Sequence, residues 1–457
     1  MNVLILGAGQ VGRGIAHYLT SRKIDVTVIE KSQELVFEIR NSANINIIQG
    51  NALDAEVLKN ANAENASHLI ATMSNDEQNI VACKLAESLF KIKTKIARTR
   101  SSSFLGNSIF ELFLKDNFGI DVLIHPELEI AKHISDVVLI RGAFDVIRLG
   151  RVIIIGLKCL DNTEVLNTTF KHFQGITNLN LFVLTIVRDG VTFFPTSKDV
   201  LLPNDEVYIA AGAEHINEVM ELFGYPQRKQ KILIIGGGNI GTFIMKIISA
   251  QTPDSNITML EKSKDRAEKI SQDYPNITTI LGDALNHDTL QEISSDVDTA
   301  IVATDHDETN VLSSLFLKKF KVNRILALAK NKNYDSLLTI NSGCSIVDPS
   351  AITIATIIKQ SGNGKILSAS YLKNQQVYIV EAEVTESCIY LNQIARPLYE
   401  KDRIIPIFIE RNDKIIPAGK NVAIELNDRI IMLVSKDCMN SMEKMFSSYF
   451  FSREDDL

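Results

Sequence analysis

The sequence is poor in cysteine, has no long apolar run and carries no excess of positive charge, and each shortage excludes a class of protein. The cysteines lie far apart without metal-ligand spacing, so we expect buried free thiols in a reducing compartment. Charges interrupt every apolar stretch before the ~18 residues that a membrane-spanning helix needs. A net charge of −7 gives no electrostatic footprint for nucleic acid. The five cysteines are Cys83, Cys159, Cys344, Cys388 and Cys438.

The rest of the composition is that of a soluble globular protein. The 457 residues are 45% hydrophobic and 23% charged, and this length suits about three or four domains. The sequence opens directly on an apolar strand pattern, without a segment that resembles a signal peptide. We therefore expect a cytoplasmic protein.

A glycine-rich motif occurs twice, about half the chain apart. The first copy, GAGQVG, runs from Gly7 to Gly12, and the second, GGGNIG, runs from Gly236 to Gly241. Each follows an apolar run of the kind that forms a buried parallel strand. One copy is weak evidence, because an ordinary strand–helix turn can carry it. Two copies indicate that a nucleotide-binding unit has been duplicated.

The spacing of the motif suits a dinucleotide. The first glycine permits the tight turn, the second lets the backbone approach a pyrophosphate, and the third lets the next helix pack against the strand. That helix directs its N-terminal N–H groups at the phosphates.

An acidic residue ends the next strand in each copy. Glu30 and Glu261 follow the first glycine of their motifs by 23 and 25 residues, near the ~20 expected for the carboxylate that binds ribose hydroxyls. A carboxylate there repels a 2′-phosphate and favours NAD or NADH, although the adjacent Lys31 and Lys262 weaken this preference.

The repeat extends beyond the glycines. The segment DEQN at 76–79 matches DETN at 307–310, 231 residues later, and each opens a helical pattern. Pro126 and Pro349 each precede an amphipathic helix, expected at 129–138 and 351–359. After about residues 142 and 365, short strands replace the alternation of strands and helices. A long internal match of this kind indicates duplication.

We therefore expect an α/β fold with two tandem Rossmann-like lobes, each followed by a small α+β lobe. The expected nucleotide-binding lobes are 1–124 and 230–349, and the expected small lobes are 143–227 and 367–453. A polar linker that contains a proline joins the two halves at 224–230.

This pattern resembles the TrkA family, the regulatory subunits of bacterial Trk potassium uptake systems, which consist of two tandem RCK units (also called KTN units). The resemblance covers essentially the whole chain. It rests on GAGQVG, on LIATMSNDEQN at 69–79, on IARTR at 96–100 and on GGGNIG. The repeated DExN segment is more diagnostic than the glycines, because many dehydrogenases carry the glycines.

The resemblance implies a ligand, NAD or NADH, with ATP or ADP as an alternative that shares the adenosine diphosphate portion. The glycine loops would hold the phosphates, the two glutamates would bind the adenosine ribose, and Arg98 would reach the phosphates or the ribose. Met73 and Ser74 would lie against the nucleotide. The predicted residues are Gly7, Ala8, Gly9, Gln10, Val11, Glu30, Met73, Ser74 and Arg98 in the first half, and Gly236, Gly237, Gly238, Asn239, Ile240 and Glu261 in the second.

The two halves depart from the family pattern in different ways. Met73 stands where a threonine is usual, whereas Thr304 keeps it, and Lys330 stands near the position of Arg98. Lysine offers a point charge in place of the forked guanidinium. We therefore expect the two sites to bind nucleotide unequally.

Regulation is favoured over catalysis, and neither catalytic residues nor a metal site is expected. A dehydrogenase needs a proton donor or acceptor near the cofactor, and neither nucleotide lobe contains a Tyr-x-x-x-Lys pair. The resemblance implies a homo-oligomer, a tetramer or a dimer. It would bind the cytoplasmic face of the membrane at a TrkH- or TrkG-type potassium transporter and gate it by a ligand-dependent conformational change. The alternatives are an NAD-dependent oxidoreductase of unknown substrate and an RCK-type sensor of another cation channel or antiporter.

Overall fold

The chain forms two compact units, each assembled from both halves of the sequence. The Rossmann unit comprises residues 1–135 and 229–361, and the small-lobe unit comprises residues 136–228 and 362–457. The computed structural model describes residues 2–21, 24–40, 45–101, 108–161, 163–169, 179–196, 198–226, 228–331, 334, 344–361, 366–372, 377–386, 388, 391–393, 404–418, 422–435, 438, 442 and 446.

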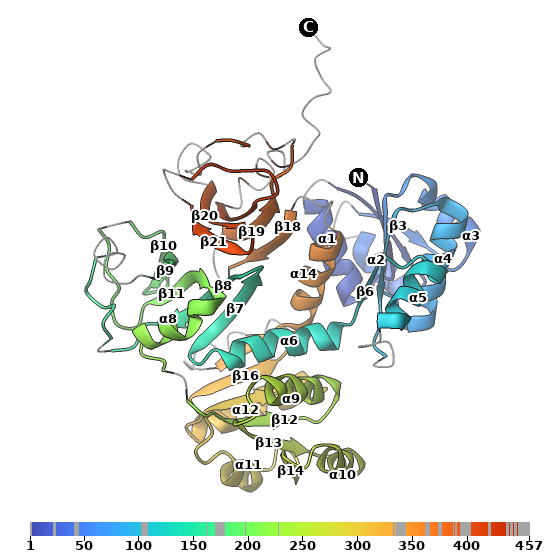
Figure 1. The fold of residues 1–457 in the computed structure, drawn as a ribbon. Coiled ribbons are helices and arrows are strands. Elements are labelled where there is room, and N and C mark those ends of the chain that lie inside the picture. The colour runs from blue at the N-terminus through green and yellow to red at the C-terminus, as the bar shows by residue number, and fades with distance from the viewer. Residues whose placement is uncertain are drawn as a thin grey trace. The chain divides into compact units, whose positions relative to one another are not determined.

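The first half of the Rossmann unit, blue in Figure 1, is a six-stranded parallel sheet. Its strand order is β3-β2-β1-β4-β5-β6. This is the Rossmann strand order, which reverses between β1 and β4 and leaves a crevice at the carboxyl ends of those strands. The elements are β1 (Asn2–Leu6), α1 (Gln10–Ser21), β2 (Asp25–Glu30), α2 (Gln33–Arg40), β3 (Asn46–Gln49), α3 (Ala55–Asn60), β4 (His68–Ala71), α4 (Asp76–Phe90), β5 (Thr94–Arg98), α5 (Ser108–Phe118), β6 (Val122–Ile124) and α6 (Pro126–Leu139).

The second half repeats this sheet in the order β14-β13-β12-β15-β16-β17. The duplication predicted from the glycine motifs is therefore confirmed strand by strand. Its elements are β12 (Lys231–Ile235), α9 (Asn239–Gln251), β13 (Asn256–Glu261), α10 (Lys264–Asp273), β14 (Thr278–Leu281), α11 (His287–Ile293), β15 (Thr299–Val302), α12 (Asp307–Lys319), β16 (Arg324–Leu328), β17 (Cys344–Val347) and α14 (Pro349–Ser361).

The apolar run of β1 is continuous because both faces of the sheet are covered. Val3 and Ile5 belong to a core cluster that includes residues of α1, whereas Leu4 and Leu6 belong to a second cluster that includes residues of α4. Successive side chains of a strand point to opposite faces, so the run supplies two cores at once.

Each Rossmann lobe contacts the crossover helix of the other half. Helix α14 packs against α1, and Ile357 is fully buried in the core cluster of the first lobe (Figure 1). Gly14 of α1 allows this approach, because a Cβ there would collide with the side chain of Ile354. At the start of α6, the His125 ring meets the Phe243 ring edge-to-face, with centroids 5.6 Å apart.

The small-lobe unit contains two five-stranded antiparallel sheets of identical topology, β10-β9-β11-β8-β7 and β21-β20-β22-β19-β18. One core cluster draws on both sheets, and the rings of Phe182 and Phe408 meet edge-to-face at 5.1 Å within it. The elements are β7 (Ala143–Leu149), β8 (Val152–Lys158), β9 (Leu181–Arg188), β10 (Val191–Phe193), β11 (Glu206–Gly212), α8 (Ile216–Leu222), β18 (Ile366–Tyr371), β19 (Val377–Glu383), β20 (Ile404–Arg411), β21 (Lys414–Pro417) and β22 (Arg429–Ser435).

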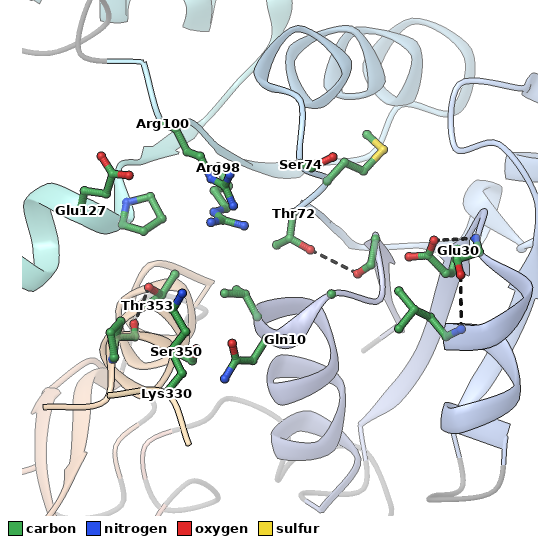
Figure 2. Close-up of a pocket in the computed structure, with 18 of the residues that line it drawn as sticks. Gln10, Glu30, Thr72, Ser74, Arg98, Arg100, Glu127, Lys330, Ser350 and Thr353 are labelled. Carbon is green, nitrogen blue, oxygen red and sulfur yellow. Dashed lines mark hydrogen bonds between the residues drawn. The ribbon is translucent and has the colours of Figure 1, made fainter. Parts of the chain in front are cut away.

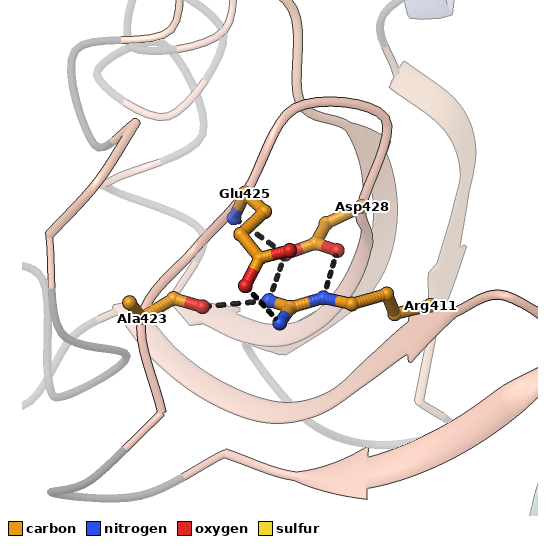
Figure 3. Close-up of polar contacts among 4 residues, drawn as sticks. All are labelled: Arg411, Ala423, Glu425 and Asp428. Carbon is orange, nitrogen blue, oxygen red and sulfur yellow. Dashed lines mark hydrogen bonds and ion pairs between the residues drawn. The ribbon is translucent and has the colours of Figure 1, made fainter.

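An arginine–aspartate clamp closes each small lobe. Arg411 donates from Nε and Nη2 to the two carboxylate oxygens of Asp428 at 2.7 and 2.8 Å, and from Nη2 to the Ala423 carbonyl (Figure 3). The hydrogen bond to Asp428 raises the pKa of Arg411 above its ordinary value. Arg188 and Asp205 repeat the same forked pair 223 residues earlier, at 2.8 and 2.7 Å.

The predicted burial of the cysteines is confirmed. All five cysteine side chains are buried, and none of them forms a disulfide. Burial raises the pKa of Cys83 and of Cys159 to about 12, so both stay protonated at neutral pH. Among the described helices, none is both long enough and apolar enough to cross a membrane.

Candidate functional site

The glycine loop after β1 has the geometry that its sequence predicts. Gly7 adopts a φ of +97°, in the left-handed region that favours glycine. A Cβ at Gly12 would collide with the Gly7 carbonyl oxygen, so this glycine brings α1 close to the strand. A Cβ at Gly9 would meet no atom within 4 Å. The space around Gly9 is thus open, as the close approach of a phosphate to the backbone would require.

Backbone donors hold Glu30 over this loop. Its Oε2 accepts the N–H of Ala8 at 2.6 Å, and its Oε1 accepts the N–H of Ser32 at 2.8 Å. The side chain is half-buried and lines a cavity. A carboxylate has about four acceptor positions, so two stay available for hydroxyl donors such as those of a ribose.

The DExN segment fixes the end of the sheet beside this loop. Asn79 is fully buried, and its Oδ1 accepts the Met73 N–H at 2.9 Å. Its Nδ2 donates to the carbonyls of Met73 and Arg98 at 3.1 and 2.8 Å. Asn310 makes the equivalent bonds to Thr304 and Leu328. The asparagine therefore joins the ends of two neighbouring strands in both halves.

The aspartate of the same segment orders the loop that follows β5. Asp76 Oδ2 accepts the Thr99 hydroxyl and the N–H groups of Arg100 and Ser101, at 2.8 to 2.9 Å. Burial alone would raise the pKa of Asp76, but these donors and the charge of Arg100 outweigh it and leave the pKa below its ordinary value. The carboxylate therefore stays charged and fixes the backbone of residues 99–101, directly after Arg98.

Arg98 is a half-buried cation with an unused donor. Its Nε is buried, and among the described residues no acceptor lies within hydrogen-bonding distance of it. Burial and then the charge of Arg100 lower the pKa of Arg98, while Asp76 and Glu127 oppose this effect. Figure 2 shows Arg98 pointing into the cavity. A phosphate oxygen there would accept from the guanidinium and neutralise it.

These groups surround one cavity of about 920 Å³ within the Rossmann unit. Its walls come from both lobes, because the carboxyl ends of both sheets and the first turns of α6 and α14 contribute to it (Figure 2). Its volume is in the range of small-molecule and cofactor sites. Its polar lining residues include Gln10, Glu30, Ser32, Ser74, Gln78, Arg98, Arg100, Glu127, Thr304, Asp305, Asp307, Lys330, Ser350 and Thr353.

The cavity brings most of the predicted residues of the first half together. Gly7, Gly9, Gln10, Val11, Glu30, Met73, Ser74 and Arg98 line it, and Ile240 joins them from the second half. The lining does not include Ala8, Gly236, Gly237, Gly238, Asn239 or Glu261.

The sequence pattern did not indicate that Glu127, Ser350 and Thr353 line the cavity. The recurrence of Pro126 and Pro349 was a signal for the helices that carry them, because both prolines begin a crossover helix and both line the cavity. The pattern gave no sign that these helices meet the lobe of the other half.

The structure corrects one alignment between the halves. Asn79 binds the carbonyl of Arg98, and Asn310 binds the carbonyl of Leu328. Asp76 binds the N–H of Arg100, and Asp307 binds the N–H of Lys330. Lys330 is thus the counterpart of Arg100, and buried Leu328 is the counterpart of Arg98. The second lobe has no basic side chain at the Arg98 position.

No cluster of three or more histidine, cysteine, aspartate or glutamate side chains in the described part of the chain is arranged to hold a metal ion. The cavity lining carries charges of both signs. Arg98, Arg100 and Lys330 bring positive charge to it, and the negative charge comes from Glu30, Glu127, Asp305 and Asp307.

Comparison with known proteins decides the family. The model of the TrkA-N domain matches residues 3–126 and 232–347. The chain belongs to the TrkA-N domain family. The two matched segments coincide with the two Rossmann lobes, and together they cover more than half of the sequence.

Relatives named Trk system potassium uptake protein TrkA match over nearly the full length. The protein from Azorhizobium caulinodans is 29% identical and that from Vibrio alginolyticus is 27% identical, and each comparison covers at least 98% of both chains. Among solved structures, the GsuK RCK domain shares the fold with a TM-score of 0.60 at 18% identity, covering 97% of this chain and 94% of that one. A GsuK channel described as bound to NAD gives a TM-score of 0.60 at 17% identity, covering 97% and 78%.

Proposed function

We propose that the chain is the nucleotide-binding regulatory subunit of a Trk-type potassium uptake system. It would bind NAD or NADH at the first glycine loop, and ATP or ADP would compete for the same place because they share the adenosine diphosphate portion. The bound nucleotide would change the conformation of the chain and thereby gate a membrane potassium transporter.

One observation carries the proposal: an acceptor pair and a cationic side chain line the same cavity beside an open glycine loop. Glu30 offers two acceptor positions, Arg98 brings its guanidinium, and Gly9 has open space around its backbone. Ribose hydroxyls donate, phosphates accept, and a pyrophosphate needs a close backbone approach. An adenine nucleotide satisfies all three groups at once.

The link to potassium uptake comes from the relatives that match over nearly the whole chain and carry that name. We place the protein on the cytoplasmic face of the membrane, as a homo-oligomer bound to a TrkH- or TrkG-type transporter. The four lobes at 1–124, 143–227, 230–349 and 367–453 would be the moving parts. A ligand shifts such an equilibrium only by its difference in affinity between the two arrangements.

Binding without turnover distinguishes this function from an oxidoreductase. Calorimetry with NADH, NAD, ATP and ADP is expected to show binding to the wild type, while the absorbance of NADH stays constant. Gly9→Ala is expected to abolish binding without loss of stability, because the added methyl group meets only the space for the phosphate. Gly238→Ala makes the same change in the second loop, where the methyl group also meets no atom within 4 Å, and therefore shows whether binding depends on the first loop. Equal affinity of wild type and Gly9→Ala would refute the proposal.

Potassium uptake tests the coupling to transport. In cells that depend on this protein for uptake, Glu30→Ala is expected to change the response of uptake to nucleotide, because the ribose contact is lost. Co-purification with the transporter should persist. If binding is lost and uptake is unaltered, the nucleotide does not control the transporter.

A further inference from the structure

Glu30 and Glu261, the two glutamates predicted to bind a ribose, accept equivalent backbone hydrogen bonds but differ in their surroundings. Glu261 accepts the N–H groups of Gly237 and Ser263, both at 2.7 Å. These bonds correspond to those that Glu30 accepts from Ala8 and Ser32. Glu261, however, is only 3% exposed, whereas Glu30 is half-buried and lines the cavity.

An arginine of the same lobe takes up part of the remaining capacity of Glu261. Arg266 Nη2 lies 3.1 Å from Glu261 Oε1. Of about four acceptor positions on a carboxylate, two are occupied by the backbone donors and one faces this guanidinium. A ribose that binds through two hydroxyls therefore has to displace a charged partner from a carboxylate that is already removed from water.

The residue that makes the difference is identified by the repeat itself. Leu35 in the first half and Arg266 in the second lie 231 residues apart, and each follows its glutamate by five residues. Leu35 lines the cavity beside Glu30. Arg266 lies in the first turn of α10, whose N-cap is Ser263. A cation is disfavoured at a helix N-terminus, so its placement there is consistent with a role in pairing Glu261.

The packing around the second loop points in the same direction. The position of Ala8 is a glycine in the second loop, Gly237, where a Cβ would lie 2.6 Å from Ile270 Cδ1 and 3.1 Å from Glu261 Oε2. A methyl group at Gly237 would therefore require the side chains of Ile270 and Glu261 to shift. Leu328 also replaces Arg98 at the phosphate side.

We infer that Arg266 acts as an internal substitute for the ribose and keeps the second glycine loop empty at nucleotide concentrations that fill the first. Each chain then binds one adenine nucleotide, and Arg266 is the positioning residue that sets this stoichiometry through Glu261. The inference rests on the proposed function for its ligand, but it concerns only the second loop.

Calorimetric stoichiometry with NADH tests this inference. The wild type is expected to bind one equivalent per chain. Arg266→Leu, which installs the residue of the first half, is expected to raise the affinity of the second loop at least about tenfold and to bring the count to two. Arg266→Lys keeps the charge and is expected to stay at one. Lys264→Leu removes a neighbouring exposed charge that pairs with Glu268, so it is the matched control and should also stay at one.

A double variant separates the two loops. Glu30→Ala/Arg266→Leu is expected to bind one equivalent, now at the second loop, whereas Glu30→Ala alone binds none. Thermal unfolding with and without NADH shows that each variant is folded. Two equivalents in the wild type, or an unchanged count in Arg266→Leu, would overturn the inference. A wild type that binds nothing refutes the proposed function. In that case, binding by Arg266→Leu still supports the inference, and its absence overturns it.

Discussion

At the scale of single residues, the two halves differ at two groups that would contact a nucleotide under the proposed function. Arg98 of the first lobe is replaced by Leu328, and the carboxylate that is accessible at Glu30 is paired with Arg266 at Glu261. The backbone around these positions is nearly the same, because Asn79 and Asn310 make equivalent hydrogen bonds. We therefore expect these differences to affect ligand binding more than folding.

Replacing Arg98 by leucine, the residue of the second lobe, is expected to weaken nucleotide binding. Hydrogen bonds to charged groups contribute about 1.5–3 kcal/mol, so the dissociation constant should rise about tenfold to a hundredfold. Stability should not fall, because the Nε of Arg98 has no partner to lose. Titration with NADH measures the dissociation constant. The control is Arg40→Leu, which replaces an exposed arginine of α2. An unchanged dissociation constant would remove Arg98 from the site.

The residues predicted from sequence were those whose role is set by local spacing. The glycines, Glu30 and the DExN segment act within a few residues of a strand end, so their pattern alone placed them. The prediction that Lys330 stands near the position of Arg98 was wrong. The spacing between the DExN segment and the next strand differs by one residue between the halves. Arg266 was missed because an ion pair is not visible in spacing, although an arginine in the first turn of a helix was a usable signal.

At the scale of elements, the strands and crossover helices were predictable because their hydrophobic patterns are strong. The helices expected at 129–138 and 351–359 are α6 and α14. The clamp of each small lobe was not predicted, since Arg411 ends β20 whereas Asp428 lies in the turn immediately before β22, and the pairing depends on that turn. The clamp satisfies a carboxylate that is 1% exposed in both lobes.

Breaking one clamp is expected to destabilise the small-lobe unit strongly. Arg411→Leu leaves Asp428 buried without its cation, and such a loss costs about 3–5 kcal/mol. The double variant Arg411→Leu/Asp428→Asn should recover part of this, because no buried charge is left unpaired. Urea unfolding measures the change, and Arg429→Leu, an exposed arginine of β22, is the control. A loss below about 1 kcal/mol in Arg411→Leu would show that the clamp adds little to stability.

At the scale of the whole chain, the main feature is that both halves contribute to one Rossmann unit. Helix α14 completes the core of the first lobe through Ile354 and Ile357. The sequence revealed the duplication. It did not reveal that each crossover helix packs on the lobe of the other half, because the apolar face of a helix does not specify which of two similar lobes it covers.

A fragment of residues 1–228 is expected to dimerise. It lacks α14, so the surface around Gly14 that receives Ile354 is left open. Helix α6 of a second copy can fill it, because Ile134 is the counterpart of Ile357 at the same separation as Pro126 and Pro349. Size-exclusion chromatography with light scattering should give twice the fragment mass. Ile134→Asp in the fragment should give a monomer, and a monomeric parent fragment would contradict the exchange.

Covalent fusion of the halves has a consequence for how such a protein diversifies. If the halves were separate, identical chains, one mutation in their gene would alter every copy of the loop in the assembly. In the fused chain, a mutation alters only one of the two loops. The chain can therefore give up ligand recognition at the loop beside Glu261 while retaining the walls and helices that this half supplies to its neighbour.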